Sequence, residues 1–265
     1  MKNLGPYEIN NIYAGECSEM MKALPDDCID LTVTSPPYDN LRKYNGYVFD
    51  YKPVIQQLDR VTKPGGVVVW VVADATINGS ETGTSFKQAL YGMSVGFNLH
   101  DTMIYLRSSP NTPESNRYGN IFEYMFVFSK DAPKTFNPLK DRKNKYAGTK
   151  IHGTQRNKNG NLQYNKSSKI IDTYGPRFNV WQIENYTPPG NKHPAIFPEA
   201  LARDHILTWS NKNEIVLDPF MGSGTTAKMA MQNGRYFLGF DISPEYVLDA
   251  SKKVAYSNPP LLIIG

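Results

Sequence analysis

The segment Glu214 to Ser243, EIVLDPFMGSGTTAKMAMQNGRYFLGFDIS, constrains the fold more than any other part of the chain. An apolar run leads into a glycine-rich turn and a helix-like stretch, and a second apolar run then ends at Asp241. A turn of this kind brings backbone close to a ligand, and an acid at the end of the next strand is placed to accept ribose hydroxyls. The segment therefore predicts half of an α/β domain that binds a nucleoside cofactor.

The residues around the two glycines limit which cofactor fits. A phosphate-binding P-loop needs Lys-Ser or Lys-Thr directly after its last glycine, and this chain has Thr225-Thr226 there, which we expect to cap the helix. The third glycine of a dinucleotide-binding motif is missing after Gly222 and Gly224. Asp218 would repel a pyrophosphate but suits a cationic group. A cofactor without phosphates, such as S-adenosylmethionine, fits this loop better.

The rest of the chain alternates strand-like and helix-like stretches in the same way. This alternation predicts an α/β fold with a mostly parallel sheet. Lys63-Pro64-Gly65-Gly66 and Gln232-Asn233-Gly234 are predicted turns. The predicted strands are 29–34, 67–72, 121–128, 215–217 and 236–240, and the predicted helices are 51–60, 85–95, 198–210, 225–233 and 244–254.

Composition excludes several classes of protein. The longest apolar run, Val67 to Ala73, is too short to cross a bilayer, so we expect no membrane association. The first ten residues lack the apolar core of a signal peptide. Cys17 and Cys28 show no metal-ligand spacing and form no disulfide framework, which favours a reducing cytoplasm and predicts no metal site.

Charge is concentrated in one segment. Residues 130–177 hold twelve Lys or Arg and three Asp, whereas the rest of the chain has a balance of −5. A basic segment with interspersed aromatic residues on an acidic body is typical of nucleic-acid binding, although a solvated surface insert has the same composition. We divide the chain into 1–129, a basic insert 130–180, and 181–265. The candidate DNA contacts in the basic insert are Lys140, Arg142, Lys143, Lys145, Lys150 and Arg156.

The stretch VTSPPYDN, Val33 to Asn40, follows a predicted strand directly. Proline gives no donor to a sheet and disfavours the helical region for the residue before it. Ser35-Pro36-Pro37-Tyr38 should therefore be a stiff, extended loop. It is either a simple strand end or a set of fixed acceptors for a ligand.

Together the two loops resemble the S-adenosylmethionine-dependent DNA amino-methyltransferases. The order, with the proline loop before the glycine loop, is similar to the permuted β class of that family, and it implies a Rossmann-like fold with a permuted strand order. The insert has the position of a target-recognition region. The matching blocks are LPDDCIDLTVTSPPY (24–38), KPGGVVVW (63–70), FEYMFVFSK (122–130), KHPAIFPEAL (192–201) and DPFMGSGTT (218–226).

The resemblance implies a role for each site residue. The Ser35 hydroxyl and the Pro36 carbonyl would accept from the exocyclic amine of a flipped-out base, with Pro37 stiffening the loop and Tyr38 stacking on the base. Asp241 would bind the ribose and Ile242 would cover the adenine. The other cofactor-binding residues implied by the resemblance are Asp218, Phe220, Gly222, Gly224, Thr225, His193 and Phe197.

Serine at the first position of the loop is more usual in N4-cytosine enzymes, while Asp-Pro-Pro-Tyr is more usual in N6-adenine enzymes. We therefore expect N4-cytosine methylation of double-stranded DNA, with N6-adenine as the alternative. C5-cytosine methylation is disfavoured because neither cysteine follows a proline. An RNA or small-molecule amino-methyltransferase and a non-catalytic DNA-binding protein on the same scaffold stay open. So do a homodimer and an accompanying restriction endonuclease.

Overall fold

The computed structural model describes residues 3–37, 49–108, 115–151, 153–164, 169–184 and 197–257. It divides into two units. The main unit comprises Met1–Asn137 and Asn179–Gly265, and Pro138–Phe178 form the second, which we call the ribbon unit. The ribbon unit thus begins eight residues later than the start of the basic insert predicted from charge.

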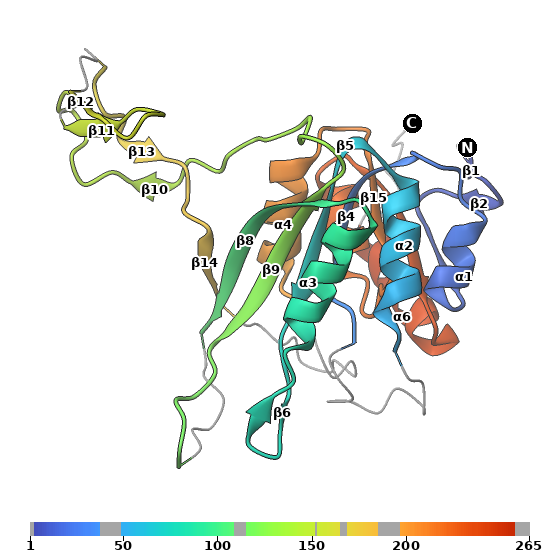
Figure 1. Ribbon diagram of the computed structural model, residues 1–265. Helices are drawn as coiled ribbons and strands as arrows, with labels where there is room; N and C mark the ends of the chain where they lie inside the picture. Colours follow the sequence, from blue (N-terminus) through green and yellow to red (C-terminus); the bar gives the residue numbers. More distant parts are fainter. Residues whose placement is uncertain are drawn as a thin grey trace, which may run out of the picture. The chain divides into compact units, whose positions relative to one another are not determined.

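The main unit is built on one eight-stranded sheet (Figure 1). Among the strands that the structure describes in this sheet, β9 (Phe122–Ser129) alone runs antiparallel to its neighbours, and the other neighbouring strands pair in parallel. This confirms the predicted α/β fold with a mostly parallel sheet. In spatial order the strands are β14 (Val180–Ile183), β8 (Asn98–Arg107), β9 (Phe122–Ser129), β5 (Thr62–Val72), β4 (Ile29–Thr34), β15 (Ile215–Asp218), β16 (Tyr236–Asp241) and β3 (Asn11–Ala14).

Helices cover both faces of this sheet (Figure 1). One layer contains α1 (Cys17–Lys22), α2 (Tyr51–Val61) and α3 (Thr84–Val95), and the other contains α4 (Glu199–Trp209), α5 (Thr225–Gln232) and α6 (Pro244–Ser257). Val68, Trp70 and Val72 of β5 join the core beneath the first layer. Alternate strand residues point to opposite faces, so the two layers explain why β5 has an uninterrupted apolar sequence. Within the described ranges, none of the helices has the length and apolarity needed to cross a bilayer.

The short strands form hairpins outside the main sheet. In the main unit, β1 (Asn3–Leu4) pairs with β2 (Tyr7–Glu8), and β6 (Thr76–Ile77) pairs with β7 (Ser80–Glu81). In the ribbon unit, β10 (Arg142–Lys143) pairs with β13 (Tyr174–Gly175), and β11 (Thr154–Arg156) pairs with β12 (Leu162–Tyr164).

The predicted turn Lys63-Pro64-Gly65-Gly66 is wrong as a break between elements, because all four residues lie inside β5. Gly65 has φ +82°, and the pairing of β5 with β4 shifts register between Ile29 and Leu31. An irregular strand of this kind uses glycine where a positive φ is needed. The glycines therefore mark an irregular position inside β5, and the strand continues through it.

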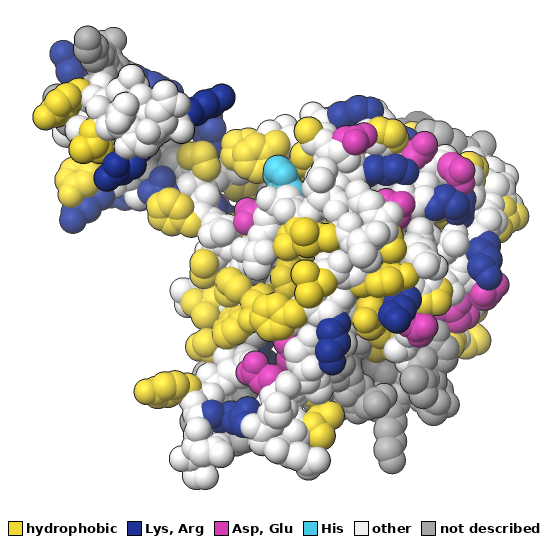
Figure 2. All heavy atoms as spheres, viewed as in Figure 1, with side chains coloured by type: hydrophobic (Ala, Val, Ile, Leu, Met, Phe, Trp, Pro, Cys, Tyr) yellow, Lys and Arg dark blue, Asp and Glu magenta, His cyan; other side chains and the backbone are white. Residues whose placement is uncertain are grey.

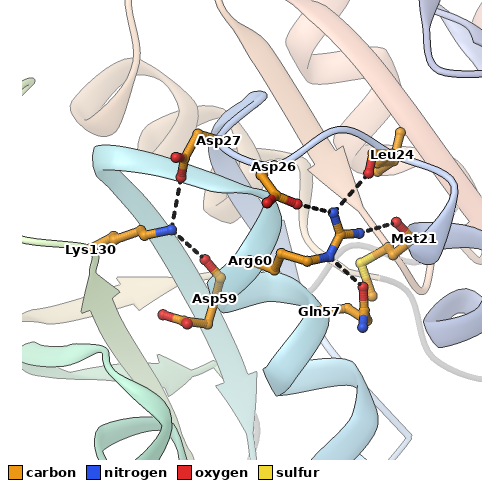
Figure 3. A network of polar contacts seen from close by, with 8 residues as sticks. All are labelled: Met21, Leu24, Asp26, Asp27, Gln57, Asp59, Arg60 and Lys130. Atoms are coloured by element: carbon orange, nitrogen blue, oxygen red, sulfur yellow. Dashed lines mark hydrogen bonds and ion pairs between the residues drawn. The ribbon is translucent and has the colours of Figure 1, made fainter.

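Arg60 of α2 joins three segments at the end of the first helical layer (Figure 3). Its guanidinium donates to the carbonyl oxygens of Met21 at 2.6 Å and Leu24 at 2.8 Å. It also donates to the side chains of Asp26 and Gln57. The four acceptors around the Arg60 guanidinium hold the segment that connects α1 to β4 in place. The proline loop follows β4 directly.

Replacing Arg60 with Ala is expected to lower the free energy of unfolding by about 2 kcal/mol, because two half-buried carbonyl groups lose their donor. Urea unfolding of the protein measures this. Lys22→Ala is the matched control, since it removes an exposed ion pair with Glu19 and should cost less than about 0.5 kcal/mol. Equal losses in the two variants would contradict the structural role of Arg60.

Candidate active site

The proline loop and the glycine loop begin side by side. They follow β4 and β15, which are adjacent and parallel. The Thr34 hydroxyl at the end of β4 donates to Asp218 Oδ1 at the end of β15, at 2.6 Å, and both side chains are buried. The Thr226 hydroxyl of α5 donates to the Val33 carbonyl at 3.3 Å. The carboxyl ends of neighbouring strands, where the chain order changes direction, are where α/β folds bind ligands.

The proline loop leaves β4 at Thr34 and passes directly into Ser35, Pro36 and Pro37. Pro36 is buried, and Ser35 and Pro37 are half-buried. These residues have no regular secondary structure, as the prolines predicted. Tyr38, predicted to stack on a base, lies outside the described residues.

The glycine loop is held by its own backbone. Gly222 and Gly224 both have positive φ, +49° and +78°. A Cβ at Gly224 would lie 2.9 Å from the Cβ of Ala250, so the close approach to α6 also requires glycine there. Gly224 is the N-cap of α5, and no side chain caps the helix. The expectation that Thr225 or Thr226 caps it was therefore wrong, because both residues lie inside the first turn and are buried.

Asp241 ends β16 and ties the glycine loop to the next strand. Its carboxylate accepts from the backbone N–H of Gly222 at 2.8 Å and of Ser243 at 2.9 Å. Its carbonyl accepts from the N–H of Gly15, which follows β3. Ile242 beside it is exposed. An ionised carboxylate is an acceptor with several lone pairs, which is the kind of group that ribose hydroxyls need.

An aromatic cluster stands next to the start of the glycine loop. The Phe220 N–H donates to Asp218 Oδ1 at 3.0 Å. The Phe220 ring packs edge-on against Phe49 at 5.2 Å and against Trp70 at 6.2 Å between ring centroids. Of the remaining predicted cofactor residues, Phe197 is half-buried just before α4, and His193 lies outside the described residues.

Two neighbours of the site were missed by the sequence analysis. Gly15 follows a strand of only four residues, too short for its apolar pattern to be recognised. Phe49 precedes Asp50, whose carboxylate caps α2 by accepting from the Lys52 N–H. An apolar residue directly before a capping Asp is a recognisable helix-start signal, and it could have placed Phe49 at the amino end of α2.

Burial controls the charge of Asp218. Loss of water raises the pKa of this carboxyl to about 6, although hydrogen bonds from the Thr34 hydroxyl and the Phe220 N–H lower it, while the nearby Asp241 raises it. A buried acid beside a second acid favours a cationic group nearby, which would stabilise the ionised form.

These contacts test which cofactor the loop accommodates. The Gly222 N–H donates to the Asp241 carboxylate, and the Gly224 N–H donates to the Met221 carbonyl. The backbone donors that a phosphate-binding loop directs at its ligand are therefore used within the protein. Together with the two acids, this arrangement fits a positively charged nucleoside and excludes a pyrophosphate cradle at these two donors.

The predicted DNA contacts belong to the ribbon unit. Arg142 and Lys143 lie on β10, and Arg156 lies on β11. Lys140 is exposed before β10, and Lys145 and Lys150 are exposed between β10 and β11. Arg142 is half-buried, since its guanidinium stacks 4.3 Å from the Phe178 ring centroid and its Nε donates to the Pro176 carbonyl.

The fold and the site define a Rossmann-like methyltransferase. A family model described as DNA methylase (N6_N4_Mtase) matches residues 29–252. The chain belongs to this family, the amino-methyltransferases of DNA that act on N4 of cytosine or N6 of adenine. Its methyl donor is S-adenosylmethionine, as the sequence predicted.

Curated relatives match over nearly the whole chain. The orphan methyltransferase M.BamHII of Bacillus amyloliquefaciens is 55% identical over 88% of this chain and 92% of its own length. The Type II methyltransferase M.BglII of Bacillus subtilis is 30% identical over 95% of this chain and 70% of its own. Among solved structures, PvuII DNA methyltransferase (cytosine-N4-specific) has a TM-score of 0.68 at 20% identity, covering 96% of this chain and 95% of that one. The likeness to that structure concerns the fold alone.

Proposed function

We propose that the protein transfers a methyl group to the exocyclic N4 of cytosine in double-stranded DNA. The observation that supports this proposal most directly is the Thr34–Asp218 hydrogen bond, because it joins the start of the proline loop to the start of the glycine loop. A methyl acceptor at the first loop and a sulfonium donor at the second would then be neighbours. Methyl transfer needs this proximity more than any single catalytic group.

The proline loop supplies the acceptors in this proposal. A cytosine amine is a poor nucleophile, because its lone pair is delocalised into the ring. The Ser35 hydroxyl and the Pro36 carbonyl would accept its two N–H groups and hold the nitrogen towards tetrahedral geometry. Pro36 and Pro37 fix these oxygens before the base arrives, so little reorganisation is needed. Tyr38 would stack on the base once it has left the duplex.

The glycine loop and its neighbours position the cofactor. S-adenosylmethionine supplies an electrophilic methyl on a sulfonium. Asp241 binds the ribose in this proposal, and Ile242 covers the adenine. The remaining contacts are assigned to Asp218, Phe220, Gly222, Gly224, Thr225, His193 and Phe197.

N6-adenine methylation is the second candidate, because both amines present two N–H groups to the same acceptors. One relative carries this description: YhdJ of Escherichia coli, 27% identical over 91% of this chain, is named a DNA adenine methyltransferase. Serine at position 35 favours cytosine. Methylation of DNA with labelled cofactor, followed by nucleoside analysis, tests the proposal. Label in N4-methylcytosine supports it, and label in N6-methyladenine replaces it with the second candidate.

A non-catalytic DNA-binding role makes a different prediction. In that case the folded protein would bind no S-adenosylmethionine, which isothermal titration calorimetry detects directly. A homodimer, a cognate restriction endonuclease and a cytoplasmic location are further proposals. Sedimentation of the protein with and without DNA tests the first of them.

Replacing Asp241 with Ala is expected to weaken S-adenosylmethionine binding about tenfold, because two backbone donors and the ribose lose their acceptor. Calorimetry measures the dissociation constant. Asp249→Ala, an exposed acid on α6, is the matched control and should leave it unchanged. An unchanged constant in Asp241→Ala would remove this residue from the ribose site.

Reversing the charge of Lys140, Lys143 and Lys145 to Glu is expected to weaken DNA binding and to reduce its dependence on salt. The slope of log K against log salt is negative, and it becomes less steep by about 0.9 for every lysine that no longer neutralises a phosphate. Fluorescence anisotropy at several salt concentrations gives this slope. An unchanged slope would mean that these exposed lysines do not bind phosphates.

A further inference from the structure

In the described residues of the ribbon unit, the two halves of the segment pair as antiparallel strands. The Arg177 N–H donates to the Leu139 carbonyl at its base, and the Asn144 N–H to the Thr173 carbonyl above it. The pairing β10–β13 belongs to this stem. Farther along, the Ile151 N–H donates to the Lys169 carbonyl. The β11–β12 hairpin, residues 154–164, forms the tip.

The stem carries its own framework. Arg177 forms a two-pronged ion pair with Asp141, its Nε lying 2.8 Å from Oδ1 and its Nη2 2.5 Å from Oδ2. The Arg142 guanidinium stacks on the Phe178 ring. We therefore take these two arginines to hold the stem together.

The tip has no hydrophobic core. Leu162 is 62% exposed and Tyr164 is 82% exposed, although both lie on a strand. An isolated two-stranded hairpin is marginally stable in water, and large apolar side chains are normally covered. Leu162 and Tyr164 are two positions apart on β12, so they share one face of the hairpin, and this face is open to a partner.

The turn at the tip is nevertheless well organised. The Asn157 side-chain oxygen accepts from the N–H groups of Asn159 and Asn161, at 3.0 and 2.9 Å. The Arg156 guanidinium donates to the Gly160 carbonyl at 2.8 Å. A turn fixed by its own hydrogen bonds loses little entropy when it binds.

Charge selects the class of partner. Residues 138–178 contain ten Lys or Arg and two Asp. Figure 2 shows Lys and Arg side chains next to exposed hydrophobic ones on this unit. The tip itself carries Arg156, Lys158 and Gln163, all exposed, and no acid. Such a surface is complementary to a polyanion.

We propose that the β11–β12 hairpin enters the major groove of double-stranded DNA and reads base edges there. This rests on the proposed function and deepens it by naming the residues that set the target sequence. The B-form major groove, about 12 Å wide, admits a two-stranded β-ribbon. The major groove of A-form RNA is too narrow for one. Arg156, Lys158 and Gln163 carry the donors and acceptors that distinguish bases, and Leu162 is placed to contact thymine methyl groups.

A shortened hairpin tests the groove without relying on catalysis. Residues 156–162 are replaced by Asn-Gly, a two-residue turn that closes the pair Gln155–Gln163. Fluorescence anisotropy compares binding to a DNA duplex and to an RNA duplex of the same sequence. The wild type should prefer DNA at least about tenfold, and the shortened variant should lose this preference while its S-adenosylmethionine affinity stays within about twofold. Retention of the full DNA preference would overturn the proposal.

Point variants test the reading of bases. Arg156→Ala, Lys158→Ala and Gln163→Ala are assayed on unmethylated genomic DNA, with modified positions read by sequencing. Relaxation of at least one position of the methylated motif is expected, with kcat/KM on the original motif falling about tenfold. The exposed Lys252→Ala on α6 is the control. An unchanged motif in all three variants would overturn the base-reading role.

The two readouts separate this inference from the proposed function. If the wild type transfers no methyl group but the shortened variant loses its DNA preference, the hairpin still binds the groove and only the enzymatic proposal fails. If the wild type methylates DNA and the shortened variant binds and methylates the same motif equally well, the hairpin proposal alone fails.

Discussion

Replacing Ser35 with Ala is expected to lower kcat for methyl transfer to DNA about a hundredfold, which is the usual effect of removing one preorganised hydrogen-bonding group from a transition state. The affinity for S-adenosylmethionine should stay within about twofold. Ser35 follows Thr34 on the β4 side of the Thr34–Asp218 hydrogen bond, whereas the cofactor contacts come from the glycine loop and β16. Loss of the hydroxyl should therefore act on the acceptor amine and not on the donor.

A conservative variant distinguishes this role from a structural one. Ser35→Asp keeps an oxygen acceptor at the same position, so it should retain clearly more activity than Ser35→Ala. Ser251→Ala, an exposed serine on α6, should behave as wild type. Single-turnover kinetics with saturating cofactor measure the chemical step directly. Equal activity of the Ala and wild-type proteins would exclude the Ser35 hydroxyl from the reaction.

The main strands of the sheet were predictable because their apolar runs are covered on both faces. Ile29–Thr34 was predicted with the bounds that β4 has, and the strand ending at Asp241 differs by one residue. β8 was missed because its first half, NLHDT, has one apolar residue and so shows no apolar run or alternation. β14 was missed because it has four residues and pairs on one side only.

The sequence alone could not predict which distant segments lie next to each other. The contact between Thr34 and Asp218 joins residues 184 positions apart, and nothing in either motif specifies that β4 and β15 are neighbours. The resemblance to a known family supplied the expectation that the two loops meet. The ribbon unit shows a different limit: charge indicated an insert, but short strands without an apolar pattern gave no sign of a β-ribbon.

Asp218→Asn is expected to change how stability depends on pH. Burial raises the pKa of Asp218 to about 6 in the folded protein, against its ordinary 3.8. The native carboxyl binds its proton more tightly than the unfolded chain does, so its contribution is full below about pH 4 and is lost as pH rises through about 6. The complete change corresponds to about 3 kcal/mol, as an order of magnitude. Urea unfolding of both proteins from pH 5 to 7.5 should show wild type losing stability relative to Asp218→Asn. A constant difference across this range would contradict the raised pKa.

The same carboxyl links proton release to cofactor binding. A sulfonium near Asp218 favours the ionised form, so binding at pH 6 should expel part of the proton that the free protein holds there. Calorimetry in buffers of different ionisation enthalpy measures the number of protons released. Wild type should release a fraction of one proton, and Asp218→Asn should release none. Asp249→Asn, an exposed acid on α6, should match wild type. Equal release by Asp218→Asn and wild type would show that the cofactor's positive charge lies away from Asp218, and the buried acid would then serve only to hold Thr34 and the Phe220 N–H in place.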